Sequence, residues 1–214
     1  MGSVWLAAMD LAEVAAVLCD MDGTLVESHA AVERAWRAWA LQYRVDADTV
    51  LAIAHGVPAD DTVRRVRPDL TDVETRTAAA RQLELQYDDL TDVVPTPGTD
   101  RLLATLARLG LPWAVVTSAD RPLAAARLRA CGIEPPLLIT VEDIPAGKPD
   151  PAGYLLAARR LGVAPQRCLV VEDAEAGVRA GRAAGALVAG VRGQAADLQP
   201  RDLGELADWL DPQK

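Results

Sequence analysis

The sequence predicts an α/β fold: a doubly wound (Rossmann-like) parallel sheet with a helical cap domain inserted after the first strand. Short apolar runs alternate with segments of helical periodicity, and most runs end in small or polar residues. The runs are nearly continuous, which indicates strands buried on both faces. One long segment, from about residue 27 to residue 95, has helical patterning and no convincing strand. Alternating strands and helices form parallel sheets, so we expect that segment to be an insert.

Five strands are expected in the sheet domain, with helices connecting them. The apolar runs that predict the strands are residues 15–19, 111–116, 137–140, 168–171 and 186–191. Helices are expected over residues 101–109, 123–130 and 151–161, because each segment stops close to a glycine, the residue that most often ends a helix. Asp150 is expected to cap the last of these helices, with Pro151 in its first turn.

The inserted segment is expected to be a bundle of helices. Its first helix is predicted by a single apolar stripe at positions 32, 35, 36, 39, 40 and 43. Further helices are expected over residues 47–54, 59–66 and 73–87, and the Pro- and Gly-rich residues 95–98 predict a hinge back to the sheet. The sequence therefore predicts a core domain of residues 14–27 and 96–214, and a cap domain of residues 28–95.

Composition excludes several classes of partner. The 214 residues include 31 acidic and 22 basic ones, for a net charge of −9, which argues against binding to nucleic acid or to an anionic membrane. No apolar run reaches the roughly 18 residues of a membrane span, and no basic region of a signal peptide is apparent. Cys19, Cys131 and Cys168 are widely spaced and are expected to be buried free thiols. We expect a cytoplasmic, monomeric protein.

Polar residues at the ends of the predicted strands are the candidates for chemistry. Ligands of open parallel sheets bind beyond the carboxyl ends of the strands. The residues placed there are Asp20 and Asp22 after the first strand, Thr117 and Ser118 after the second, Lys148 in the loop after the third, and Glu172 and Asp173 after the fourth. The spacing of two residues puts Asp20 and Asp22 on one side of an extended segment.

Four crowded carboxylates require a cation or raised pKa values. Hard oxygen ligands suit Mg²⁺, which also binds phosphate oxygens. A lysine and hydroxyl groups supply the positive charge and the hydrogen bonds that a phosphoryl group needs. An EF-hand is excluded because Gly23 would fall at the fourth position of the loop and not at the sixth.

Four segments resemble the four motifs of the haloacid dehalogenase superfamily. They are residues 20–25 (DMDGTL), 116–118 (VTS), 147–149 (GKP) and 171–174 (VEDA), and the resemblance covers nearly the whole chain, including a helical cap between the first two motifs. Residues 31–36 (AVERAW) and 110–118 (GLPWAVVTS) resemble the bacterial sugar-phosphate phosphatases of that superfamily. The resemblance implies a Mg²⁺-dependent phosphatase that hydrolyses a small sugar or polyol phosphate monoester through an aspartyl-phosphate intermediate.

The resemblance also implies a role for each catalytic candidate. Asp20 would be the nucleophile that attacks phosphorus, and Asp22 would protonate the leaving oxygen and later deprotonate water. Thr117, with Ser118 beside it, would bind the phosphoryl oxygens. Lys148 would offset the negative charge of Asp20 and of the phosphate.

The same resemblance implies a magnesium site. Asp20, the backbone carbonyl of Asp22 and Asp173 would be ligands of the ion. Glu172 would complete the site either directly or through a water molecule, and Asp173 is favoured over Glu172 as the direct ligand.

Substrate specificity is expected to come from the cap. His55 and Gly56 begin a loop that enters a helix and resembles the substrate-specificity loop of the family, with Arg64 further along that helix. These three residues are the candidates for binding the sugar. His29 is expected to lie on the hinge side of the cap.

Four alternatives to a phosphatase fit the sequence to different degrees. Asp22 argues against a dehalogenase proper, because those enzymes share the fold but lack an acid two residues after the nucleophile. The main alternative is a phosphosugar mutase like β-phosphoglucomutase; such mutases carry a cap histidine where this chain has Val32. Phosphonatases use a lysine of the cap, but the only lysines in this sequence are Lys148 and Lys214, outside the predicted cap. A phosphonatase is therefore excluded. A regulatory protein that binds or carries a phosphorylated aspartate is less favoured, because no catalytic residue is missing.

Overall fold

The computed structural model describes residues 11–54, 57–87 and 89–211. Within them, residues 11–25, 95–124 and 134–211 form one compact unit, which holds the sheet, and the remaining residues form a second, helical unit. Residues 125–133 group with the helical unit, whereas the sequence analysis assigns them to the core. The predicted domain bounds stay a prediction.

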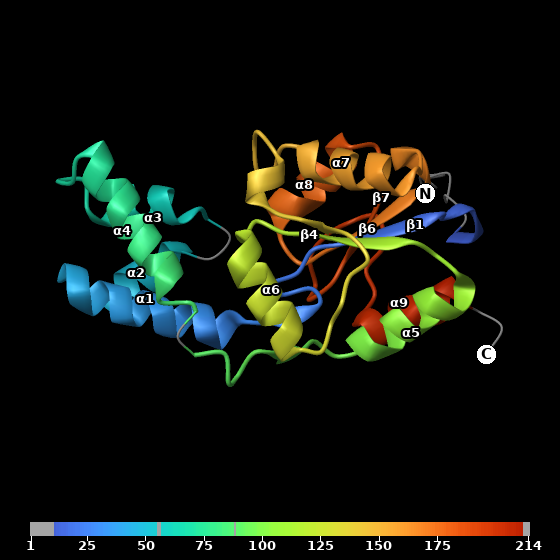
Figure 1. Ribbon diagram of the computed structural model, residues 1–214, viewed down its shortest axis with the longest axis horizontal. Coiled ribbons are helices and arrows are strands. Elements are labelled where there is room, and N and C mark those ends of the chain that lie inside the picture. The colour runs from blue at the N-terminus through green and yellow to red at the C-terminus, as the bar shows by residue number, and fades with distance from the viewer. Residues whose placement is uncertain (1–10, 55–56, 88, 212–214) are drawn as a thin grey trace, which may run out of the picture. The chain divides into compact units, whose positions relative to one another are not determined.

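The first unit contains the predicted parallel sheet (Figure 1). Its strands, in spatial order, are β5 (Leu138–Ile139), β4 (Trp113–Val116), β1 (Ala16–Cys19), β6 (Cys168–Glu172) and β7 (Leu187–Gly190). All neighbouring strands run parallel, so the predicted fold class is confirmed. β1 lies at the centre, with Cys19 opposite Val115 of β4 and Val171 of β6.

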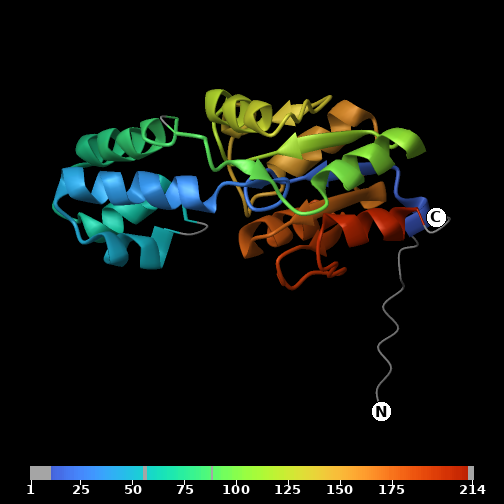
Figure 2. The ribbon, with the colours of Figure 1, turned by 90° about the horizontal axis from the view of Figure 1, so that it is seen from below.

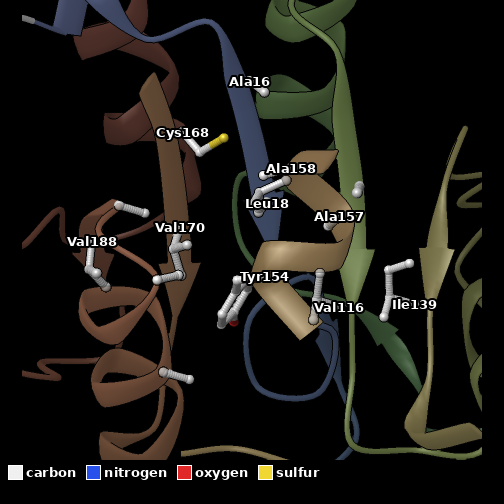
Figure 3. Close-up of a cluster of buried hydrophobic side chains, with 14 of the residues drawn as sticks. Ala16, Leu18, Val116, Ile139, Tyr154, Ala157, Ala158, Cys168, Val170 and Val188 are labelled. Atoms are coloured by element: carbon white, nitrogen blue, oxygen red, sulfur yellow. The ribbon is translucent and has the colours of Figure 1, made fainter. Parts of the chain in front are cut away.

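Helices cover both faces of this sheet. α7 (Ala152–Leu161) and α8 (Glu175–Ala183) lie on one face, and α5 (Thr99–Leu109) and α9 (Leu203–Leu210) pack together on the other (Figures 1 and 2). The core between the sheet and α7 is made of small and branched side chains around one aromatic ring. Figure 3 shows this cluster, which includes Leu18, Val116, Ile139, Tyr154, Ala157 and Val170. Because every residue of β1 and β6 is buried, both strands are apolar without alternation up to Glu172, the last residue of β6.

Most helix ends agree with the signals in the sequence, but the N-cap of α7 differs from the expected one and two helices were not expected. α5 and α7 end at Gly110 and Gly162, which have left-handed φ angles of 65° and 71°. Pro151, and not Asp150, is the N-cap of α7; the Asp150 carboxylate instead accepts a hydrogen bond from the Ala152 amide at 2.9 Å. Neither α8 nor α9 was expected from the sequence; glycines interrupt both segments, two in α8 and one in α9.

The second unit is helical, as expected. Its helices are α1 (His29–Tyr43), α2 (Ala47–Ala54), α3 (Ala59–Val66) and α4 (Asp72–Glu84), and α6 (Arg121–Ala130) runs from the first unit into the second. The apolar stripe of α1 is buried in a cluster with α2, α3 and α4. At its centre, Trp39 stacks on Tyr43 with ring centroids 4.5 Å apart and donates a hydrogen bond to the Ala78 carbonyl at 2.8 Å.

The structure corrects three smaller expectations. β2 (Val26–Glu27) and β3 (Val94–Pro95) form a two-stranded sheet at the two ends of the insert, where no strand was expected, because two residues are too few to leave a pattern. α4 ends at Glu84, before the expected residue 87. Cys131 is only half-buried, whereas Cys19 and Cys168 are buried as expected. Among the described residues, no helix has the length and apolar character needed to cross a bilayer.

The core predicts a clear difference between two leucines of the first unit. Leu18→Ala in β1, where the side chain is 1% exposed, should lower the free energy of unfolding by about 2–5 kcal/mol because it leaves a cavity. Leu155→Ala in α7, where the side chain is 40% exposed, should change it by less than about 1 kcal/mol. Urea unfolding followed by circular dichroism measures both, and equal losses would contradict the packing described here.

Candidate active site

The carboxyl ends of β1 and β6 bring three acids together. The two strands are neighbours in register, and the amide of Asp20 donates to the Val171 carbonyl at 2.9 Å. Glu172 and Asp173 follow immediately. Oxygen atoms of Asp20, Glu172 and Asp173 lie within 4.8 Å of one another. The parallel register therefore converts two sequence motifs about 150 residues apart into one acidic cluster.

Lys148 supplies the positive charge at this cluster. It comes from the loop after β5, and its ammonium group pairs with the Asp20 carboxylate and, at 2.6 Å, with Glu172 Oε1. The side chains of Lys148 and Asp20 are only 12% and 10% exposed, so water screens their interaction weakly. Burial alone would lower the pKa of Lys148, but the charges of Asp20 and Glu172 raise it above its ordinary value. Lys148 is therefore protonated at neutral pH.

Asp20 experiences opposing influences. Burial raises the pKa of its carboxyl group, the Lys148 ammonium group lowers it, and the charges of Glu172 and Asp173 raise it again. The net direction is upward. Because Lys148 pairs with two of the three carboxylates, it cannot balance their charge alone. A further cation or protonation of a carboxyl group would balance the remaining charge.

Glu172 is held rigidly from all sides. Its side chain is 1% exposed; Oε1 accepts hydrogen bonds from the Tyr154 hydroxyl at 2.6 Å and from Lys148, and Oε2 accepts from the amides of Asp173 and Ala174 at 3.2 and 3.4 Å. Gly177 of α8 makes room for it, because a Cβ there would lie 1.7 Å from Oε1. Tyr154 also presents its ring to Lys148, with the Nζ atom 5.4 Å from the centroid.

The loop after β1 packs against Asp173. Gly23 has a φ angle of +83°, and a Cβ at this position would lie 1.9 Å from Asp173 Oδ2. Only glycine allows both the turn and this close approach. Asp22, which precedes Gly23, is half-buried in the same loop.

Thr117 and Ser118 lie at the end of β4, the strand next to β1. Thr117 is buried, and its hydroxyl oxygen accepts a hydrogen bond from the Ala119 amide at 3.1 Å, which shapes a tight turn. Ser118 is exposed. Both residues are therefore at the same edge of the sheet as the acidic cluster.

The remaining candidate residues come from the helical segment. His55 and Gly56 lie outside the described residues. Arg64 is exposed on α3, where it pairs with Asp61 at 3.3 Å. The imidazole of His29 contacts Glu27 at 2.7 Å.

Sequence reasoning missed two side chains that touch the site. Tyr154 sits inside a helix whose apolar pattern is explained by packing alone, so no local signal marks it. Arg192 follows β7, and its Nε donates to the Gly23 carbonyl at 2.7 Å. The same strand-end rule that selected Asp20 and Glu172 would have found Arg192 had it been applied to the last strand.

Comparison with known proteins identifies the family. A family model described as haloacid dehalogenase-like hydrolase matches residues 14–185. The chain belongs to this family. The resemblance seen in the sequence and the prediction of a hydrolytic enzyme are thereby confirmed.

Two curated relatives and one solved structure illustrate the similarity. Hexitol phosphatase A of Escherichia coli is 41% identical over 179 residues, which cover 83% of each chain. The 2-deoxyglucose-6-phosphate phosphatase 1 of Saccharomyces cerevisiae is 34% identical over 202 residues, 85% of this chain and 82% of its own. CbbY from Rhodobacter sphaeroides, in complex with phosphate, superposes with a TM-score of 0.78 over 90% of this chain and 96% of its own. At 24% identity, CbbY shows the fold alone.

The packing of Gly23 yields a prediction with an internal control. Gly162 also has a positive φ, of +71°, but a Cβ there would meet nothing within 4 Å. Gly162→Ala should therefore cost only the backbone strain, about 1–2 kcal/mol of unfolding free energy. Gly23→Ala should cost about 1–3 kcal/mol more, because Asp173 must move. Chemical denaturation compares the two variants, and equal losses would refute the close packing.

Proposed function

We propose that this hydrolase is a Mg²⁺-dependent phosphatase that hydrolyses a small sugar or polyol phosphate monoester through an aspartyl-phosphate intermediate. The observation that carries the proposal is the Asp20–Lys148 pair beside Glu172 and Asp173. The two curated relatives described above support the substrate class, since their names specify a hexitol phosphatase and a deoxyglucose-6-phosphate phosphatase.

The donor set fits Mg²⁺. It consists of hard carboxylate oxygens with an excess of negative charge, and no nitrogen or sulfur ligand is among them. Asp20, Asp173 and the backbone carbonyl of Asp22 would hold the ion. The oxygens of Glu172 already accept hydrogen bonds from Tyr154, Lys148 and two amides, which favours Asp173 as the direct ligand. When bound, Mg²⁺ would neutralise charge on the transferring phosphoryl group.

The side chains of this chain would carry the reaction in two halves. Asp20 attacks phosphorus in line, while Lys148 and the hydroxyl of Thr117 neutralise and orient the phosphoryl oxygens. Asp22 donates a proton to the leaving oxygen. In the second half, Asp22 takes a proton from the water that attacks the aspartyl-phosphate, and the cycle ends with inorganic phosphate and a free Asp20 carboxylate.

The alternatives receive less support. A mutase would need a cap group to shuttle protons on a bound sugar phosphate. Mutases like β-phosphoglucomutase carry a histidine at the position where this chain has Val32. A regulatory protein would not need Asp22 beside Asp20. Roles for His55, Gly56 and Arg64 in sugar binding, together with the monomeric state and the cytoplasmic location, stay predictions.

Replacing the nucleophile tests the chemistry. Asp20→Asn should abolish phosphate release from a panel of sugar, polyol and nucleotide monophosphates, because an amide cannot form the acyl phosphate. Adding EDTA to the wild type should also stop release, and excess Mg²⁺ should restore it. A colorimetric phosphate assay measures both.

The matched control is Asp100→Asn, an exposed carboxylate on α5 that should leave activity unchanged. Retention of near-native activity by Asp20→Asn would refute the nucleophile assignment. Interconversion of glucose phosphates without phosphate release would favour the mutase.

Replacing the general acid should separate the two halves of the reaction. Asp22→Asn should still form aspartyl-phosphate from p-nitrophenyl phosphate, whose leaving group needs no proton, but should hydrolyse it slowly. Rapid-quench kinetics should show a burst of nitrophenol followed by a steady state slower by about 10²–10⁴-fold. Wild-type kinetics on sugar phosphates would show that Asp22 has no acid–base role.

A further inference from the structure

Three consecutive carbonyl groups of the loop after β1 accept hydrogen bonds from side chains outside the four motifs. Arg192 Nε donates to the Gly23 carbonyl at 2.7 Å, Thr96 Oγ1 donates to the Thr24 carbonyl, and Thr99 Oγ1 donates to the Leu25 carbonyl at 3.0 Å. All six residues belong to the first unit. The donors come from two places in the chain: the segment after β7 and the segment at the start of α5.

These bonds hold a loop that has little regular structure of its own. The amides of Thr24 and Leu25 both turn back to the Met21 carbonyl, at 3.3 and 2.9 Å, so Asp22 lies at the tip of a tight turn. The Leu25 carbonyl also accepts from the Thr96 amide at 3.0 Å, whereas the bonds described for the Gly23 and Thr24 carbonyls come from the Arg192 and Thr96 side chains. These bonds fix the peptide planes of the turn that carries Asp22.

Arg192 is held in an unusual conformation to make its bond. Its φ angle of 56° is left-handed, which costs a residue other than glycine roughly 1–2 kcal/mol. The preceding amide, that of Val191, donates to the Glu172 carbonyl at 2.8 Å. Arg192 therefore extends from a turn anchored on the strand that carries Glu172 and reaches the loop that carries Asp22. Strain of this kind is typically retained where it positions functional groups.

We propose that Arg192 is a positioning residue that aligns Asp22 for proton transfer to the leaving group, with Thr96 and Thr99 holding the far side of the same turn. This inference rests on the proposed function. Arg192 acts through the Gly23–Thr24 peptide, the second peptide after Asp22, and takes no part in the attack by Asp20 or in charge neutralisation by Lys148.

Leaving-group chemistry distinguishes positioning from general structural support. An alkyl phosphate expels an alkoxide and depends on the proton from Asp22, whereas p-nitrophenyl phosphate expels a stable phenolate and does not. Misalignment of Asp22 should therefore slow the first class selectively. A variant that merely loosens the protein should slow both classes alike.

The test compares Arg192→Asn with the wild type on p-nitrophenyl phosphate and on the alkyl phosphate that the wild type hydrolyses fastest. Asparagine tolerates a left-handed φ, so the variant removes the guanidinium group without adding backbone strain. We expect kcat for the alkyl phosphate to fall by roughly tenfold or more, and single-turnover formation of nitrophenol to change by less than about threefold. Arg192→Lys, which keeps one donor, should restore part of the loss.

Two further variants complete the experiment. Arg182→Asn is the matched control, because Arg182 belongs to the same unit and its guanidinium group pairs with the Asp197 carboxylate at 2.8 Å and not with a carbonyl of the loop after β1. This variant should hydrolyse both substrates like the wild type. Thr96→Val removes the bond to the Thr24 carbonyl with little change in side-chain shape. It should show the same selectivity as Arg192→Asn. The proposal can therefore be tested with this variant if Arg192→Asn does not fold.

The outcomes separate the two proposals. Equal losses on both substrates, or no loss, would overturn the positioning role of Arg192 while leaving the phosphatase intact. A wild type that releases phosphate from neither substrate would overturn the proposed function, and the inference with it. Selective loss on alkyl phosphates, rescued by lysine, is the result that the structure predicts.

Discussion

Charge balance around Lys148 is the constraint on which the rest of the site depends. One buried ammonium group pairs with Asp20 and Glu172, and Asp173 lies within the same cluster. Removing an ammonium group from water is unfavourable unless carboxylates surround it, and crowding carboxylates is unfavourable unless cations do. Each charged group therefore makes the others possible, and the remaining negative charge suits a divalent ion. This arrangement is stable only at the end of a sheet whose strands hold the carboxylates in register.

The scaffold around these charges is adapted to their geometry. The carboxylate of Glu172 accepts a hydrogen bond from the hydroxyl of Tyr154, and it fits against α8 because Gly177 has no side chain. Gly23 allows the loop after β1 to pack against Asp173. In the proposed reaction, rigid support of this kind would keep Asp20 and Lys148 in a reactive arrangement before substrate binds, which reduces reorganisation.

Asp20 and Asp22, the proposed nucleophile and the proposed general acid–base, are supported differently. Asp20 is the first residue after β1, and its amide bonds to β6, so the sheet positions it directly. Asp22 lies two residues further along, in the turn after β1. The carbonyl of the next residue, Gly23, accepts a hydrogen bond from Arg192. This division is the basis for the proposal that Arg192, a residue after the last strand, positions Asp22 without belonging to a catalytic motif.

The sequence alone determined the fold class, the succession of the five sheet strands along the chain, and the acids, hydroxyls and lysine that follow them. These features depend on local patterns: apolar runs, glycine stops and short motifs that survive without knowledge of the rest of the chain. The tertiary structure decided the roles of Tyr154 and Arg192 and the tight packing of Gly23 and Gly177. Arg192 is 169 residues from Gly23 in the chain, and only the pairing of β1, β6 and β7 brings the two together. Contacts at such separation follow from sheet register, which no local pattern specifies.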